Sequence, residues 1–93
     1  MKVRTQQPVN AAIRTLDESE RGKVFAWLRH LENWENDEHV RKMSKVIRPD
    51  NVYVLNTSDD IRIFFKLDPA KQEISIIDIA KPSRFASVPV ASE

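Results

Sequence analysis

Two cations stand on one predicted β-strand, in a pattern that suits phosphate binding. Between residues 61 and 67, apolar side chains alternate with Arg62, Phe64 and Lys66, which is the period-two pattern of a strand with two different faces. Arg62 and Lys66 therefore share a face. A guanidinium held on a rigid strand can donate two hydrogen bonds to a phosphate. The simpler interpretation is that this face is solvated and that both cations are ordinary exposed residues.

A second group of cations precedes the predicted strands. The segment RKMSKVIR, from Arg41 to Arg48, contains four basic residues and no acidic one. The formal net charge of the whole chain is only +1, and proteins that bind nucleic acid through many phosphate contacts are usually more basic. The charge distribution thus indicates a local basic patch within a nearly neutral chain.

Other kinds of site have little support in the sequence. The chain has no cysteine, so neither a disulfide nor a thiolate site is possible. His30 and His39 lie nine residues apart without further ligands at metal-binding spacing, and the single glycine, Gly22, excludes a glycine-rich phosphate loop. We therefore expect no metal and no cofactor.

The composition is typical of a small globular protein. A chain of 93 residues with 31% charged and 41% hydrophobic residues suits one domain with one core. We expect that domain to span residues 1–86, with residues 87–93 as a C-terminal tail. The first residues contain no apolar run that would serve as a signal peptide or a membrane span, which predicts a cytoplasmic protein.

The N-terminal half predicts a short strand followed by helices. The strand is KVRT, and Pro8 suits the first turn of a brief helix. Asp17 with Glu20 three residues later forms a capping-box pattern. Asn36 or Asp37 is expected to cap a third, short helix. The main helix should present one apolar stripe, made of Val24, Trp27, Leu28, Leu31 and Trp34.

The C-terminal half predicts strands. NVYVLNT, DIRIFFKLD and EISIIDIA are rich in β-branched and aromatic residues and are joined by short connections. Such connections indicate antiparallel neighbours. The sequence thus predicts an α+β fold, in which an N-terminal strand and helices pack on one face of a three- to four-stranded antiparallel sheet. The other sheet face is left open.

This order of elements resembles that of the RelE/ParE toxin superfamily, whose members are toxins of type II toxin–antitoxin systems. The resemblance covers nearly the whole chain. Its most specific part is Asp60 and Arg62 followed by an apolar run and an acidic turn, and Ala80 with Lys81 then occupies the place of the family's GH or GK pair. The resemblance implies a ribosome-dependent messenger-RNA endonuclease of the RelE type, active without metal and bound by an antitoxin protein.

The resemblance also implies roles for individual residues. Arg62 corresponds to the strand arginine that stabilises the phosphate during cleavage, and Arg84 is the candidate for a second catalytic arginine. Four lysines are the expected RNA contacts: Lys42, Lys45, Lys66 and Lys81.

Several departures from the family pattern keep an alternative open. Pro82 stands where relatives often have arginine, Val54 and Asn56 replace strand arginines, and Phe85 offers a ring without the proton of the family's C-terminal tyrosine. The alternative is a non-catalytic protein: a ParE-like inhibitor of DNA gyrase, or a decayed relative that acts as a protein-interaction module.

Overall fold

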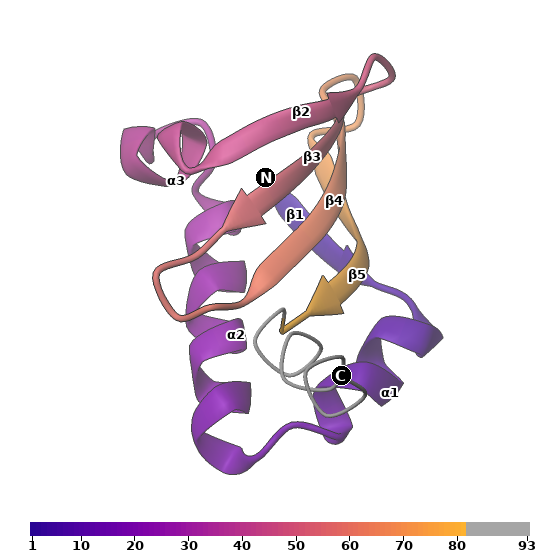
Figure 1. The fold of residues 1–93 in the computed structure, drawn as a ribbon. Helices are drawn as coiled ribbons and strands as arrows, with labels where there is room; N and C mark the ends of the chain where they lie inside the picture. Colours follow the sequence, from indigo (N-terminus) through magenta and orange to yellow (C-terminus); the bar gives the residue numbers. More distant parts are fainter. Residues whose placement is uncertain (82–93) are drawn as a thin grey trace, which may run out of the picture.

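A β-strand opens the chain, and three helices follow it before the rest of the sheet. The computed structural model describes residues 1–81, and Figure 1 shows its arrangement. Residues 1–81 form eight elements: β1 (Lys2–Thr5), α1 (Gln7–Arg14), α2 (Glu18–Glu32), α3 (Glu38–Lys42), β2 (Ser44–Arg48), β3 (Val52–Asn56), β4 (Arg62–Asp68) and β5 (Glu73–Ala80).

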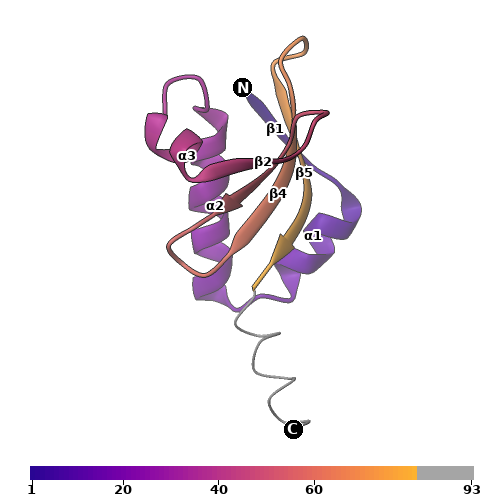
Figure 2. The same cartoon turned by 45° about the horizontal axis from the view of Figure 1, so that its top comes forward.

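The predicted α+β class is confirmed, but the sheet is larger than expected. It has five strands in the order β1-β5-β4-β3-β2. The four later strands pair in antiparallel fashion, whereas β1 runs parallel to β5, so the sheet is mixed. The extra strand is β2, which is built from the basic run and lies at the edge. Figures 1 and 2 accordingly show α3 and β2 on the opposite side of the molecule from α1.

The predicted capping box starts α2. The backbone N–H of Glu20 donates to Asp17 Oδ1 at 2.7 Å, and the backbone N–H of Asp17 donates to Glu20 Oε1 at 3.3 Å. Two of the N–H groups that a helix start leaves without partners are thereby satisfied. Asp37, one of the two predicted caps of α3, accepts from the backbone N–H of Val40 at 3.0 Å.

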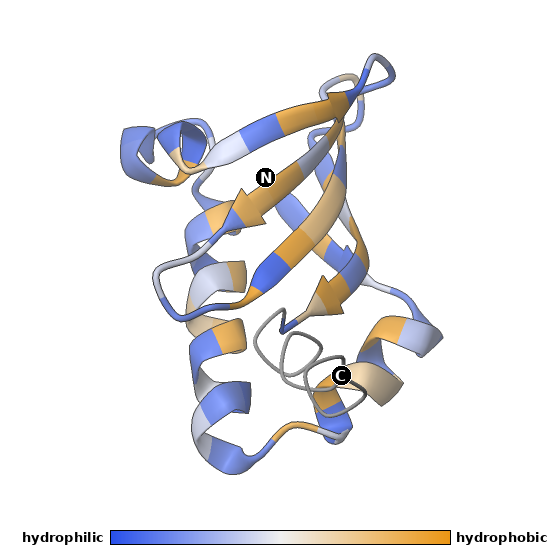
Figure 3. Cartoon of the chain, in the orientation of Figure 1, coloured by the Kyte–Doolittle hydropathy of each residue, from blue (hydrophilic) through white to orange (hydrophobic). Residues whose placement is uncertain are grey.

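The core lies between the helices and one face of the sheet. Its helical part includes Val9, Ile13, Val24, Leu28 and Leu31, its strand part includes Leu55, Ile63, Phe65, Leu67, Ile74 and Ile76, and Ile61 joins it from the loop before β4. Figure 3 shows the corresponding pattern, with hydrophobic colour concentrated on the strands and α2 largely hydrophilic apart from separate hydrophobic patches. Burying one such side chain contributes roughly 1.5–3 kcal/mol, so this layer accounts for much of the stability.

The two tryptophans have different roles. Trp34 lies just after α2, is 8% exposed, and contacts Tyr53 and Phe65 edge-on at centroid distances of 5.5 and 5.6 Å. Trp27 is only partly buried and packs against the core, and its indole N–H donates to Asp59 Oδ2 at 2.9 Å. The predicted stripe is therefore found on α2 for Val24, Trp27, Leu28 and Leu31, with Trp27 at its polar margin, whereas Trp34 joins the core from beyond the end of the helix.

The expected boundary at residue 86 and the tail 87–93 lie outside the described residues. Within residues 1–81, no helix is long and apolar enough to cross a membrane.

Candidate nucleic-acid interface

Strand register assigns each side chain to a sheet face. Directly opposite residues on paired strands share a face. One row across the sheet therefore contains Lys45, Val54, Phe64 and Asp78, because these residues are paired in sequence across β2, β3, β4 and β5. This is the face opposite the helix-covered core, since Ile63 and Phe65 flank Phe64 in the chain and are both fully buried. We call it the open face.

Neighbouring rows bring more cations to the open face. Arg62 is paired with Asn56 and Ala80 in one row, and Lys66 is paired with Val52 and Ser75 in another. Arg48 pairs with Val52 from the edge strand, which adds it to the row of Lys66. The open face thus presents Lys45, Arg48, Arg62 and Lys66.

These cations have few competing partners. Arg62 and Lys45 are exposed, and neither side chain makes a hydrogen bond or an ion pair with any residue in the range 1–81. Arg48 Nε and Lys66 Nζ each lie 3.8 Å from a carboxylate oxygen of Asp50. Exposed ion pairs at that distance contribute little to the stability of the fold. All four cations are therefore accessible to an anion.

An apolar hollow lies among the cations. It has a volume of about 290 Å³, and its walls are formed by Ile47, Arg48, Val52, Phe64, Ile77 and Asp78. Ile47 and Ile77 are 47% and 46% exposed. Both are the extra residues of register shifts, one in β2 and one in β5. A β-bulge redirects side chains in this way.

The loop before β4 fixes the start of the strand that carries Arg62. The Thr57 hydroxyl donates to the carbonyl of Ile61 at 2.8 Å and accepts from the backbone N–H groups of Asp59 and Ile61 at 3.2 Å. Asp59 in turn accepts from the Trp27 indole of α2 at 2.9 Å. Arg62 therefore extends from a backbone that is tied to the main helix.

Two of the predicted lysines lie away from this face. Lys42 is on α3, where its ammonium is 3.1 Å from Glu38 one helical turn earlier. Lys81 Nζ is 2.5 Å from Glu20 Oε2, and both side chains are mostly buried. That ion pair would have to open before Lys81 could contact RNA. Arg84, with Pro82 and Phe85, lies outside the described residues.

Few groups suited to proton transfer lie on the open face in the described part of the chain. Tyr53 belongs to the inner face, where its ring stacks on Phe65 at a centroid distance of 5.3 Å. The two histidines lie on α2 and α3. Among residues 1–81, the carboxylate closest in register to Arg62 on this face is Asp78, one row away.

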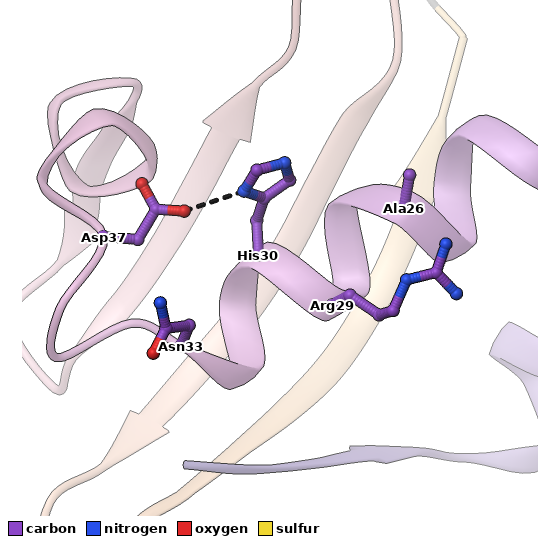
Figure 4. Close-up of a pocket in the computed structure, with 5 residues that line it drawn as sticks. All are labelled: Ala26, Arg29, His30, Asn33 and Asp37. Carbon is purple, nitrogen blue, oxygen red and sulfur yellow. Dashed lines mark hydrogen bonds and ion pairs between the residues drawn. The ribbon is translucent and has the colours of Figure 1, made fainter.

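A second hollow, of about 470 Å³, lies along α2 and is formed by Ala26, Arg29, His30, Asn33 and Asp37 (Figure 4). His30 Nδ1 and Asp37 Oδ2 are 2.7 Å apart. The hydrogen bond from His30, and then the one from the backbone N–H of Val40, lower the pKa of Asp37 below its ordinary value of 3.8. The pair joins α2 to the cap of α3, which is a sufficient structural role. No group of three or more potential metal ligands occurs in the described part of the chain.

Sequence reasoning assigned no role to three residues of the open face. Arg48 was visible in the basic run, and Phe64 was visible in the alternation of β4. Asp78 gave no such signal, because strict alternation along EISIIDIA puts it on the face of Ile74 and Ile76. The bulge at Ile77 moves Asp78 to the open face.

The fold matches that of known toxins. The chain is similar to a chain of the intact Escherichia coli RelBE toxin–antitoxin complex, with a TM-score of 0.68 and 14% identity over 86% of this chain and 94% of that one. The isolated E. coli RelE toxin gives the same TM-score and identity over 86% and 82%. The RelBE2 toxin–antitoxin complex of Mycobacterium tuberculosis gives 0.60 and 11% over 86% and 95%. No protein-family model and no curated protein sequence matches the chain.

These likenesses confirm the fold that the sequence resemblance implied. The chain has a RelE-like fold over 86% of its length. At identities of 11% and 14%, these similarities establish the shared fold alone. One fold can support unrelated functions.

Proposed function

We propose that the chain is a toxin-like component of a type II toxin–antitoxin system and acts as a RelE-like, ribosome-dependent messenger-RNA endonuclease. The observation that carries this proposal is the position of Arg62. Its guanidinium is exposed on the open face and has no partner within residues 1–81. Lys45, Arg48 and Lys66 share that face. In the proposal, Arg62 meets the phosphate that is cleaved and the other cations hold the RNA backbone.

The proposed chemistry needs no metal. The ribose 2′-hydroxyl gives its proton to solvent, its oxygen attacks the adjacent phosphorus, and the bond from phosphorus to the 5′-oxygen breaks. The products are a 2′,3′-cyclic phosphate and a 5′-hydroxyl, whose proton comes from solvent. Negative charge grows on the phosphate oxygens as the new bond forms, and a guanidinium placed beside those oxygens stabilises that charge more strongly than it stabilises the ground state.

The remaining residues and partners of the proposal follow from the RelE likeness. Lys42 and Lys81 are proposed as further phosphate contacts, and Arg84 as a second catalytic arginine. An antitoxin protein is the proposed partner, since two of the similar structures are toxin–antitoxin complexes. The site of action would be cytoplasmic, where messenger RNA is translated.

A non-catalytic, ParE-like gyrase inhibitor or interaction module is the second candidate. It is favoured by the scarcity of acid–base groups that residues 1–81 place on the open face: Tyr53 packs in the core, and the histidines lie on the helices. A protein that acts by docking would not need such groups.

Induced expression in a bacterial host tests the proposal. Growth is followed and messenger-RNA ends are mapped for the wild type, for Arg62→Ala, and for Arg29→Ala as a control. Arg29 is an exposed arginine on α2, so its loss changes the net charge equally but leaves the open face intact. The proposal predicts growth arrest with new cuts in translated messages for the wild type and Arg29→Ala, and neither effect for Arg62→Ala.

The other outcomes separate the candidates. Growth arrest without new RNA ends would contradict the endonuclease and support the gyrase inhibitor. Normal growth with abundant, folded wild-type protein would contradict a toxin of either kind.

A further inference from the structure

The hollow on the open face has the features of a nucleobase site. Phe64 supplies an aromatic surface, and Ile47, Val52 and Ile77 complete the apolar lining. The hollow has a volume of about 290 Å³. Every nucleobase has a π-face, and stacking on an aromatic side chain is a common way to hold single-stranded nucleic acid. The volume is at the lower end of the range for small-ligand pockets, which suits one flat ring system.

The charges around the hollow favour a nucleotide over an apolar peptide side chain. Arg48 forms part of the wall, and Lys66 and Arg62 flank Phe64 along β4 on the same face. Lys45 approaches from β2, two positions across the row from Phe64. A nucleotide in the hollow would thus have cations on several sides for its phosphates. A peptide would need acidic residues at each of these positions.

Asp78 is the one acidic residue among the described residues that line the hollow. It is exposed, and its Oδ1 accepts from the backbone N–H of Ile79 at 2.8 Å, which restrains the carboxylate. A carboxylate can accept about four hydrogen bonds in all, so both oxygens still have lone pairs for a ligand. Guanine presents two adjacent donors, N1–H and N2–H, whereas the other bases place an acceptor beside a donor.

We propose that this hollow is a guanine-binding subsite, in which the base stacks on Phe64 and donates from N1 and N2 to Asp78. The inference rests on the proposed function, because it assumes that RNA reaches the open face. It assigns base selectivity to a residue that takes no part in the proposed cleavage step. The phosphates flanking the guanosine would contact Arg62 on one side and Arg48 with Lys66 on the other.

Binding of short RNAs to the purified full-length chain tests the subsite. The probes are fluorescein-labelled five-nucleotide uridine RNAs with guanine, inosine or uracil as the central base. Every ribose of the probes carries a 2′-O-methyl group, so that no 2′-hydroxyl is available to attack a phosphate. Fluorescence anisotropy at low ionic strength gives the Kd. Inosine lacks only the N2 amino group, so it isolates the second donor.

We expect the guanine probe to bind about fivefold more tightly than the inosine probe, at the lower end for a bidentate base contact. Asp78→Ala should remove that preference. Asp68→Asn is the control, since it removes a carboxylate from the same strand as Phe64 but outside the hollow, and it should leave the preference intact. Phe64→Leu should weaken all three probes by about fivefold or more through lost stacking.

Equal affinities for guanine and inosine, or a preference that survives Asp78→Ala, would overturn the subsite. So would an absence of RNA binding, or affinities unchanged by Phe64→Leu. Guanine-selective binding without growth arrest in the expression test would contradict the endonuclease and leave the subsite standing. Arrest with mapped cuts but without base selectivity would overturn the subsite alone.

Discussion

The indole N–H of Trp27 donates a hydrogen bond to Asp59 at 2.9 Å and thereby ties α2 to the loop that leads into β4. Asp59 also lies 3.9 Å from Lys23 on the same helix. The loop ends at Ile61, which is 1% exposed, and Arg62 follows it directly. The helix thus supports the backbone that precedes Arg62, although α2 and the Arg62 side chain lie on opposite sides of the sheet.

Trp27→Phe should lower the free energy of unfolding by about 1 to 2 kcal/mol, because it removes a partly buried hydrogen bond to a carboxylate. Urea denaturation measures the change. A double-mutant cycle with Asp59→Ala should give a coupling energy near 1 kcal/mol. Lys23→Ala is the control, and its exposed ion pair should contribute less than about 0.5 kcal/mol. Additive effects of the Trp27 and Asp59 substitutions would contradict the link.

Truncation of a side chain at the centre of the helix–sheet core should strongly lower the free energy of unfolding. Leu28→Ala and Phe65→Ala should each destabilise by about 2 to 5 kcal/mol, because each leaves a cavity between α2 and the sheet. Leu28 and Phe65 are 8% and 0% exposed. Ile77→Ala is the matched control on the same sheet, since Ile77 is 46% exposed, and it should change stability by no more than about 0.5 kcal/mol. Equal denaturation midpoints for the three variants would contradict the packing of Leu28 and Phe65 between α2 and the sheet.

Arg62→Ala should leave the free energy of unfolding within about 0.5 kcal/mol of the wild type, because the side chain is exposed and has no partner within residues 1–81 to lose. The same urea experiment measures it. A loss above 1 kcal/mol would make Arg62 a structural residue and would undermine its place in the proposed site.

The lowered pKa of Asp37 predicts a pH-dependent contribution to stability. The contribution is fully present above the ordinary pKa of 3.8, and it is lost as the pH falls through the lower pKa of the folded state. The difference in unfolding free energy between the wild type and Asp37→Asn should therefore be constant near neutral pH and shrink in acid below about pH 4. Asparagine retains the capping function, so the comparison isolates the charge. A difference that grows in acid would have the wrong sign.

Gln72 has a backbone φ of 52°, in the left-handed region that costs a non-glycine residue roughly 1 kcal/mol. Gln72→Gly should therefore raise stability by about 0.5 kcal/mol after the added entropy of the unfolded chain is subtracted. Thermal unfolding at fixed pH measures the shift. Destabilisation would show that the glutamine side chain contributes more than its backbone strain costs.

Local patterns predicted the elements that local physics determines. The capping box located α2 because its two hydrogen bonds join residues three positions apart. Alternation located β4 and assigned its inner face, since the side-chain period of a strand is two. The resemblance in the order of elements then predicted the RelE-like fold.

Long-range pairing was beyond these patterns. The parallel pairing of β1 with β5 joins residues about seventy positions apart, such as Val3 and Ile74, and nothing local signals it. The edge strand β2 was hidden because its basic residues gave no alternation. The bulge at Ile77 is a tertiary feature, so the position of Asp78 on the open face could only be found in the structure.

The most direct test of the central claim is cleavage of messenger RNA by the purified chain on programmed ribosomes, mapped by primer extension. If the chain is the proposed endonuclease, the wild type and Arg29→Ala should cut at translated codons, and Arg62→Ala should lose at least about a hundredfold in rate, the size typical of one lost transition-state donor. Cuts by Arg62→Ala at the wild-type rate, or no cuts by a folded wild-type protein, would contradict the proposal.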